Sequence, residues 1–143
     1  WTEVAAPVEV PPAPPPEPNL ASVRHSMDAG HWGEAREVCQ SLLAAHRLDP
    51  VLHFHMALVE EQLGHEAAAE RFLRQALYLD RTYVLAHYHL GLLLRRRHDA
   101  AGARRCFQNA LRLLAETASD RVLAEGLTAE AVRDLATMHL ELL

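Results

Sequence analysis

The most constraining feature of this chain is a pattern of small and apolar residues that repeats every 34 residues. Gly30 aligns with Gly64, Ala35 aligns with Ala69, and the second pair continues to Ala103. The chain is rich in Ala and Leu, and its apolar positions follow a helical period. A unit of this length folds as a helical hairpin that cannot cover its own apolar face, so successive hairpins must stack. The sequence therefore predicts an all-α solenoid.

Three hairpins and a C-terminal capping helix account for most of the chain. The predicted helices span residues 20–29, 33–46, 50–63, 66–79, 83–97, 100–115 and 128–142, with a short helical turn near 120–123. The repeats cover about 19–49, 50–83 and 84–117, within a repeat domain that covers 19–143. The length, period and hairpin pattern resemble tetratricopeptide repeats. This resemblance implies a right-handed superhelical α-solenoid.

Helix boundaries are marked by residues with a defined backbone role. Asp49 is followed by proline, which predicts an N-cap and a first helical position. Gly30 and Gly64 are predicted to end first helices in the left-handed conformation. His98 takes that place in the third repeat, where Asp99 is expected to cap the next helix.

The capping helix is predicted from a local cap and an apolar stripe. Thr128 has the side chain of an N-cap. Ala131, Leu135, Met138 and Leu142 share one helical face. We expect this face to shield the open end of the stack, because a solenoid needs its terminal surface covered.

Close packing is expected where small residues recur. Ala57 and Gly91 occupy the same position of the first helix in their repeats, where a second helix must approach closely. Cys39 falls on a core position, and Cys106 is expected to be partly exposed. These two cysteines lie two repeats apart and are not expected to pair, which favours a reducing, cytoplasmic compartment.

The N-terminal stretch 1–18 differs in composition from the rest of the chain. It holds seven of the eight prolines, which favour an extended linker. The alternative is a ligand for a polyproline-binding module, although flanking basic residues are missing. Because the chain begins with Trp1 and not Met, we expect it to be part of a longer protein. It shows no signal-peptide layout and no apolar run long enough to span a membrane.

Charge argues against some partners. The net charge of −5 disfavours a general nucleic-acid binder. Basic residues nevertheless gather in the third repeat: Arg95, Arg96, Arg97, Arg104, Arg105 and Arg112. They are interpreted as a solvated face balanced by Glu60, Glu61, Glu66 and Glu70, with an acidic protein partner as the alternative.

One face of the first helices is predicted to line a concave groove for a protein or peptide partner. The candidate groove residues are Phe54, Leu58, Glu61, Tyr88, His89, Leu92, Arg95 and Arg96. A bound peptide would bury apolar side chains on this floor and place an acidic group against Arg95 or Arg96. The alternative is that these side chains only pack against neighbouring helices.

No catalytic, cofactor-binding or metal-binding residues are predicted in this chain. The histidine pairs His53 and His55, and His87 and His89, are each spaced by two residues, which points their side chains to nearly opposite helix faces. The glycines form no strand-to-helix loop for a nucleotide-like cofactor.

The stretch from Ala76 to Arg96, with 109–114 and 125–128, resembles the tetratricopeptide region that follows the catalytic domain of some CheR-type chemotaxis methyltransferases. The resemblance implies a parent enzyme that transfers methyl groups from S-adenosylmethionine to glutamates of bacterial chemoreceptors. This chain would be its recognition or regulatory arm, binding the receptor or the parent's own catalytic domain, or a purely structural arm. The alternative is a scaffold or adaptor of an unrelated bacterial assembly or secretion system.

Overall fold

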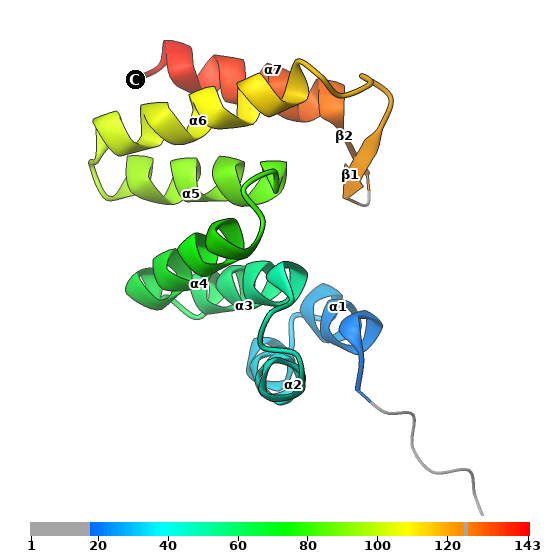
Figure 1. Ribbon diagram of the computed structural model, residues 1–143. Helices are drawn as coiled ribbons and strands as arrows, with labels where there is room; N and C mark the ends of the chain where they lie inside the picture. The colour runs from blue at the N-terminus through cyan, green and yellow to red at the C-terminus, as the bar shows by residue number, and fades with distance from the viewer. Residues whose placement is uncertain (1–17, 125) are drawn as a thin grey trace, which may run out of the picture.

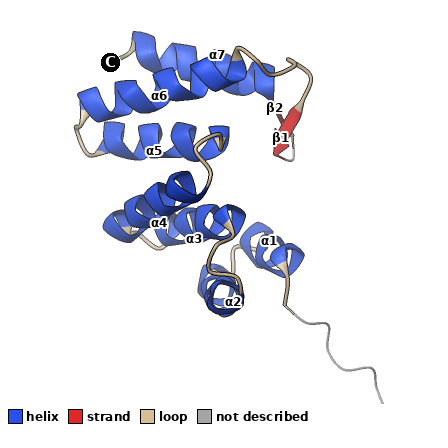
Figure 2. Ribbon diagram, in the orientation of Figure 1, coloured by secondary structure: helices blue, strands red, loops and turns tan. Residues whose placement is uncertain are grey.

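The computed structural model describes residues 18–124 and 126–143, which form seven helices and a two-stranded hairpin (Figures 1 and 2). The elements are α1 (Leu20–Asp28), α2 (Trp32–Ala45), α3 (Pro50–Gln62), α4 (Glu66–Leu79), α5 (Val84–Arg96), α6 (Ala100–Leu114), β1 (Val122–Ala124), β2 (Leu127–Thr128) and α7 (Ala129–Glu141). Residues 1–17 of the predicted proline-rich linker lie outside the described residues.

The helices stack in chain order. α1 packs on α2, α3 on α4 and α5 on α6, and each pair contacts the next along the chain (Figure 1). The ends of each predicted helix differ from the observed ends by no more than one residue. The prediction of an α-solenoid built from three helical hairpins and a terminal helix is confirmed. Within the described part of the chain, no helix is long and apolar enough to cross a membrane.

The predicted caps explain why the helix ends were found from sequence. Asp49 accepts a hydrogen bond from the Val51 amide, and Asp99 accepts one from the Gly102 amide. Gly30 and Gly64 take left-handed conformations, with φ of 76° and 83°. His98 takes the equivalent conformation, with φ of 63°, at the position where the earlier repeats have glycine.

Gly91 lies where α5 and α6 approach most closely. A Cβ atom built on this glycine would lie 2.8 Å from Cε1 of the Phe107 ring. Phe107 is fully buried and belongs to the main core, which extends from α3 to α7. The predicted need for a small residue at this position is therefore confirmed, and its cause is the ring of a single neighbour.

A second, smaller core lies between the first hairpin and α3. Val23, Cys39 and Met56 are buried together, with Met27 and Leu42 among the partly buried side chains around them. The core position predicted for Cys39 is thus confirmed. Cys106, which was expected to be partly exposed, is buried against the main core.

The terminal helix α7 covers the end of the stack, as predicted, but it is rotated so that only part of the predicted stripe, including Leu135, faces the core. Val132 and Ala136 are fully buried. Met138 and Leu142 of the predicted stripe are 45% and 62% exposed. Arg133 helps to set this rotation, because its Nη2 donates to the Leu114 carbonyl at the end of α6. Contacts with α6 thus determine which side of α7 is buried, and Met138 and Leu142 of the predicted stripe remain exposed.

This rotation of α7 predicts unequal effects for two apolar substitutions. Val132→Ala should lower the free energy of unfolding by about 1 to 2 kcal/mol, because it leaves a cavity in the core. Leu142→Ser should change it by less than about 0.5 kcal/mol, because that side chain is mostly in water. Urea denaturation followed by circular dichroism measures both. A larger loss for Leu142→Ser would mean that the predicted stripe is the packed one.

The helical turn predicted near residues 120–123 is wrong. β1 and β2 pair antiparallel there, with Val122 opposite Thr128 and Ala124 opposite Leu127. Gly126 has φ of 72°, a conformation suited to a tight turn. The hairpin projects from the stack beside the start of α7 (Figure 2).

Candidate functional site

A pocket of about 440 Å³ opens among α1, α3, the start of α5 and the hairpin. We call it the central pocket. Its lining residues are Arg24, Asp28, Val51, Phe54, His55, Leu58, Tyr83, Leu85, His89, Leu123, Ala124 and Leu127. The pocket is therefore assembled from all three repeats and from a segment that belongs to no repeat.

Helical spacing places the apolar lining residues on the pocket. Phe54 and Leu58 lie four residues apart on α3, and Leu85 and His89 lie four apart on α5, so each pair shares one helix face. The Phe54 ring contacts the rings of Tyr83 and His89, with centroid separations of 5.0 Å and 5.3 Å. These edge-to-face contacts join the second repeat to the third beneath the pocket.

The floor of the central pocket is uncharged at neutral pH. Burial, with a smaller effect from the Arg96 charge, lowers the pKa of His89 to about 4. Burial also lowers the pKa of His55, whose Nδ1 donates to the Val51 carbonyl at 2.8 Å. Burial raises the pKa of Tyr83 to about 12, so its hydroxyl keeps its proton. The charged side chains of the lining are Arg24 and Asp28, both on α1.

A further cavity, also of about 440 Å³, lies on the other side of β1. It includes polar residues such as Asp80, Thr82 and Glu116. Tyr83, Leu85 and Leu123 line both cavities. Leu123 of β1, with Tyr83 and Leu85, therefore forms a wall that the two cavities share.

The predicted groove residues divide into three groups. Phe54, Leu58 and His89 line the central pocket. Leu92, Arg95 and Arg96 line a separate depression of about 350 Å³ near the end of α5. Glu61 and Tyr88 line neither cavity, so the structure does not join the eight residues into one continuous floor.

Tyr88 is a core residue of the third repeat. It is 7% exposed, and its ring packs against Phe107 and His139, with centroid separations of 5.9 Å and 6.0 Å. Arg95 is also held by α7, because its Nη1 donates to Nδ1 of His139 at 2.6 Å. The terminal helix therefore covers this end of the face that the sequence assigned to the groove.

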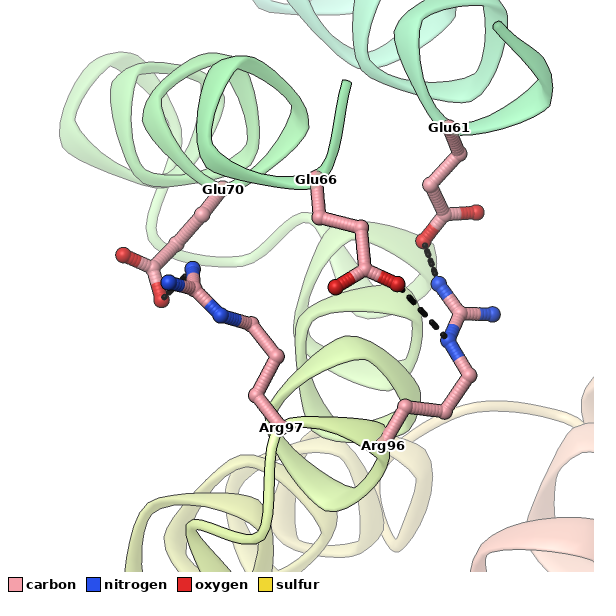
Figure 3. Close-up of polar contacts among 5 residues, drawn as sticks. All are labelled: Glu61, Glu66, Glu70, Arg96 and Arg97. Carbon is pink, nitrogen blue, oxygen red and sulfur yellow. Dashed lines mark hydrogen bonds and ion pairs between the residues drawn. The ribbon is translucent and has the colours of Figure 1, made fainter. Parts of the chain in front are cut away.

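Two of the six arginines of the basic cluster predicted in the third repeat are paired with glutamates. Arg96 lies 2.9 Å from Glu61 and 3.9 Å from Glu66, and Arg97 lies 3.4 Å from Glu70 (Figure 3). These contacts link the end of α5 to the second repeat. The interpretation of a face balanced by glutamates is confirmed for Arg96 and Arg97.

Several pocket residues were not predicted as site residues. Leu123, Ala124 and Leu127 come from the hairpin, which lies outside the repeat pattern and so has no equivalent earlier in the chain. The glycine at position 126, between two short apolar stretches, is the sequence signal that could have located the hairpin. Asp28, one helical turn beyond Arg24 on α1, was also not predicted.

Comparison with solved structures defines the class of fold. PcrH in complex with the chaperone binding region of PopD has a TM-score of 0.75 at 20% identity, over 85% of each chain. The first TPR of Spaghetti (RPAP3) bound to the HSP90 peptide SRMEEVD has a TM-score of 0.66 at 19% identity, over 85% of this chain and 89% of that one. The chain thus has a tetratricopeptide-repeat fold.

One curated relative is a methyltransferase. The chain is 34% identical over 85 residues to the probable biofilm formation methyltransferase WspC of Pseudomonas aeruginosa, covering 59% of this chain and 20% of WspC. The chain therefore matches about a fifth of the length of that relative. The resemblance to the repeat region of a methyltransferase is confirmed by this match. No protein-family model matches the chain.

Proposed function

We propose that the central pocket binds a short segment of a partner protein, and that this segment inserts a large apolar side chain. The single observation that carries the proposal is a pocket of about 440 Å³ with an apolar, uncharged floor. A volume of this size is typical of ligand sites that are mainly apolar with a few polar groups. The charged pair on α1, Arg24 and Asp28, would orient the backbone or polar side chains of the segment.

The uncharged floor selects against some ligands. A carboxylate or ammonium group inserted beside His89 and Phe54 would lose its hydration without gaining an opposite charge. An aliphatic or aromatic side chain would gain from burial on Phe54, Leu58 and Leu127. We therefore expect a Leu, Met or Phe anchor, and we place any acidic group of the segment near Arg24.

Two structures with the same fold support a peptide ligand. By their descriptions, PcrH holds a region of PopD and the RPAP3 domain holds an HSP90 peptide. The Yersinia enterocolitica type III secretion translocator chaperone SycD has the same fold, which favours a second candidate function, that of a scaffold or adaptor in an assembly or secretion system. Both candidate functions use the chain as a module for protein binding.

We further propose that the parent protein is a protein-glutamate methyltransferase with S-adenosylmethionine as the methyl donor, and that this chain is its recognition or regulatory arm. The similarity to part of WspC supports this placement. A chemoreceptor, or the parent's own catalytic domain, would then supply the bound segment. The setting would be cytoplasmic chemotaxis-type signal transduction.

Peptide selection tests the pocket. A library of random dodecapeptides displayed on phage should yield binders that share a large apolar residue. Leu58→Glu should weaken the selected peptides by about tenfold or more, because it places a charge at the pocket wall. Fluorescence anisotropy with a labelled selected peptide measures the affinity.

Met138→Glu is the matched control, because it introduces the same charge at an exposed apolar position on α7. It should leave the affinity unchanged within about twofold. Circular dichroism should show equal helicity for both variants. Equal binding to the Leu58 and Met138 variants, or a selection without binders, would contradict the proposal.

The role within the parent is tested by deletion of residues 20–143 from the full-length protein. Under the proposal, the deletion changes which receptor glutamates are methylated, as measured by mass spectrometry of the receptor. A purely structural arm predicts unchanged sites and unchanged turnover. That result would contradict the regulatory proposal and leave the pocket experiment unaffected.

A further inference from the structure

The second helices of the second and third repeats expose a row of arginines. Arg71 and Arg74 lie three residues apart on α4, and Arg104, Arg105 and Arg112 lie on α6. All five side chains are exposed. We call these five residues, together with Tyr78, the arginine face. None of them lines the central pocket.

The repeat pattern relates the exposed arginines of α4 to those of α6. Arg71 and Arg105 are separated by the repeat length of 34 residues, so they occupy the same position of successive hairpins. Burial raises the pKa of the Cys106 thiol, and the positive charges of Arg74 and Arg105 act to lower it. Because equivalent positions of successive hairpins face the same side of a solenoid, the arginines of α4 and α6 lie on the same side of the stack. Glu37 takes the equivalent position in the first repeat, where the basic row ends.

The arginine face keeps most of its charge. Within the described residues, Arg71, Arg104, Arg105 and Arg112 make no ion pair within 4 Å. Arg74 lies 3.8 Å from Glu70, which is shared with Arg97. Glu61, Glu66 and Glu70 of the second repeat instead face Arg96 and Arg97 at the end of α5 (Figure 3). The ion pairs thus neutralise the end of α5 and leave α6 positive.

An aromatic side chain lies on the same surface. Tyr78 is four residues beyond Arg74 on α4, so the two side chains share a helix face, and Tyr78 is 78% exposed. Tyrosine and arginine are the residue types most often found as energetic anchors in protein interfaces. The guanidinium group donates two parallel hydrogen bonds to a carboxylate, a geometry that lysine cannot supply.

We propose that the arginine face binds an acidic segment of a partner protein, with carboxylates on Arg104 and Arg105 and an apolar contact on Tyr78. A short segment experiences mainly the local positive charge, because salt screens charges beyond about 8 Å. A nucleic acid or an anionic bilayer would extend past the face and meet the rest of a chain whose net charge is −5. These observations favour an acidic protein segment over both polyanions.

The test uses a fluorescein-labelled helical peptide with glutamates along one side and a single leucine, and a control peptide with glutamine at every glutamate. Wild-type protein should bind the acidic peptide, measured by anisotropy at an ionic strength of about 0.15 M. Double substitution of Arg104→Glu and Arg105→Glu should weaken binding by about tenfold or more. The control substitutions Arg47→Glu and Arg121→Glu, at exposed arginines outside the face, should change it by less than about twofold.

Three outcomes would overturn the proposal. They are no preference for the acidic over the glutamine peptide, equal losses in the two double variants, and tighter binding to phosphatidylserine vesicles or duplex DNA than to the peptide. Circular dichroism of each variant establishes that it is folded. The Leu58→Glu variant should retain acidic-peptide binding, so failure of the central-pocket proposal and failure of this one are distinguishable.

Discussion

Gly91→Leu should lower the free energy of unfolding by at least about 3 kcal/mol, and Gly91→Ala by about 1 to 3 kcal/mol. The reason is that even a methyl group at this position would lie 2.8 Å from the buried Phe107 ring. Either α5 and α6 must move apart or the ring must leave its place in the core. Urea denaturation followed by circular dichroism gives both values.

Gly33→Ala is the matched control for Gly91. Gly33 lies within α2, and a Cβ atom built there has no neighbour within 4 Å. Because alanine favours helices over glycine, this substitution should stabilise the protein by about 0.5 to 1 kcal/mol. Adding Phe107→Leu to Gly91→Ala should recover part of the loss, since it removes the clashing ring atoms. If Gly91→Ala left the free energy of unfolding unchanged, the packing of α5 against α6 would adjust easily at this contact.

Glu60→Gln should lower the free energy of unfolding at pH 7 by about 2 to 3 kcal/mol. Glu60 is 1% exposed, and its two carboxylate oxygens bind different repeats. Arg36 Nε of α2 lies 2.5 Å from Oε1, and His65 Nδ1, just before α4, lies 2.6 Å from Oε2. The substitution removes the charge that satisfies both partners and weakens the junction of the first and second repeats.

The pH dependence of this loss follows from the pKa of Glu60. Burial acts to raise that pKa, but hydrogen bonds from Arg36 and His65 outweigh burial and lower it below its ordinary value of 4.5. A lowered carboxylate pKa contributes stability above the unfolded value, and the contribution is lost as the pH falls through the folded pKa. The difference between wild type and Glu60→Gln should therefore shrink below pH 4.5. Denaturation curves at pH 7 and in the acid range measure it.

Glu66→Gln serves as the control for Glu60. Glu66 is exposed and lies 3.9 Å from Arg96, so its contribution should be below about 0.5 kcal/mol. Equal effects of the two substitutions would show that the buried carboxylate does not link the repeats. A difference that grows at acid pH would contradict the direction of the Glu60 pKa shift.

The helices and their ends were predictable because their determinants are local. A cap such as Asp49 acts on amides a few residues away, and Gly30 and Gly64 act through their own φ angles. The 34-residue period then implied stacking, since each hairpin leaves an apolar face uncovered. The small residue at Gly91 was also predictable, because the equivalent position of the second repeat holds another small residue, Ala57.

The candidate site was predictable only in part. Of the residues that helical spacing grouped, Phe54, Leu58 and His89 line one pocket. Tyr88 was placed in the same group, but α7 covers it through His139. The hairpin residue Leu127 was missed because it follows no repeat, and its position depends on how the segment after α6 folds back.

The number, ends and order of the helices follow from the sequence, because caps, turns and apolar periodicity act within a few residues of the chain. Which helix faces remain open depends on tertiary packing. The rotation of α7 depends on its fit against α6, including the bond from Arg133 to Leu114. That fit buries Val132, places His139 against Tyr88 and exposes Leu142, because burial is a property of all packed neighbours together.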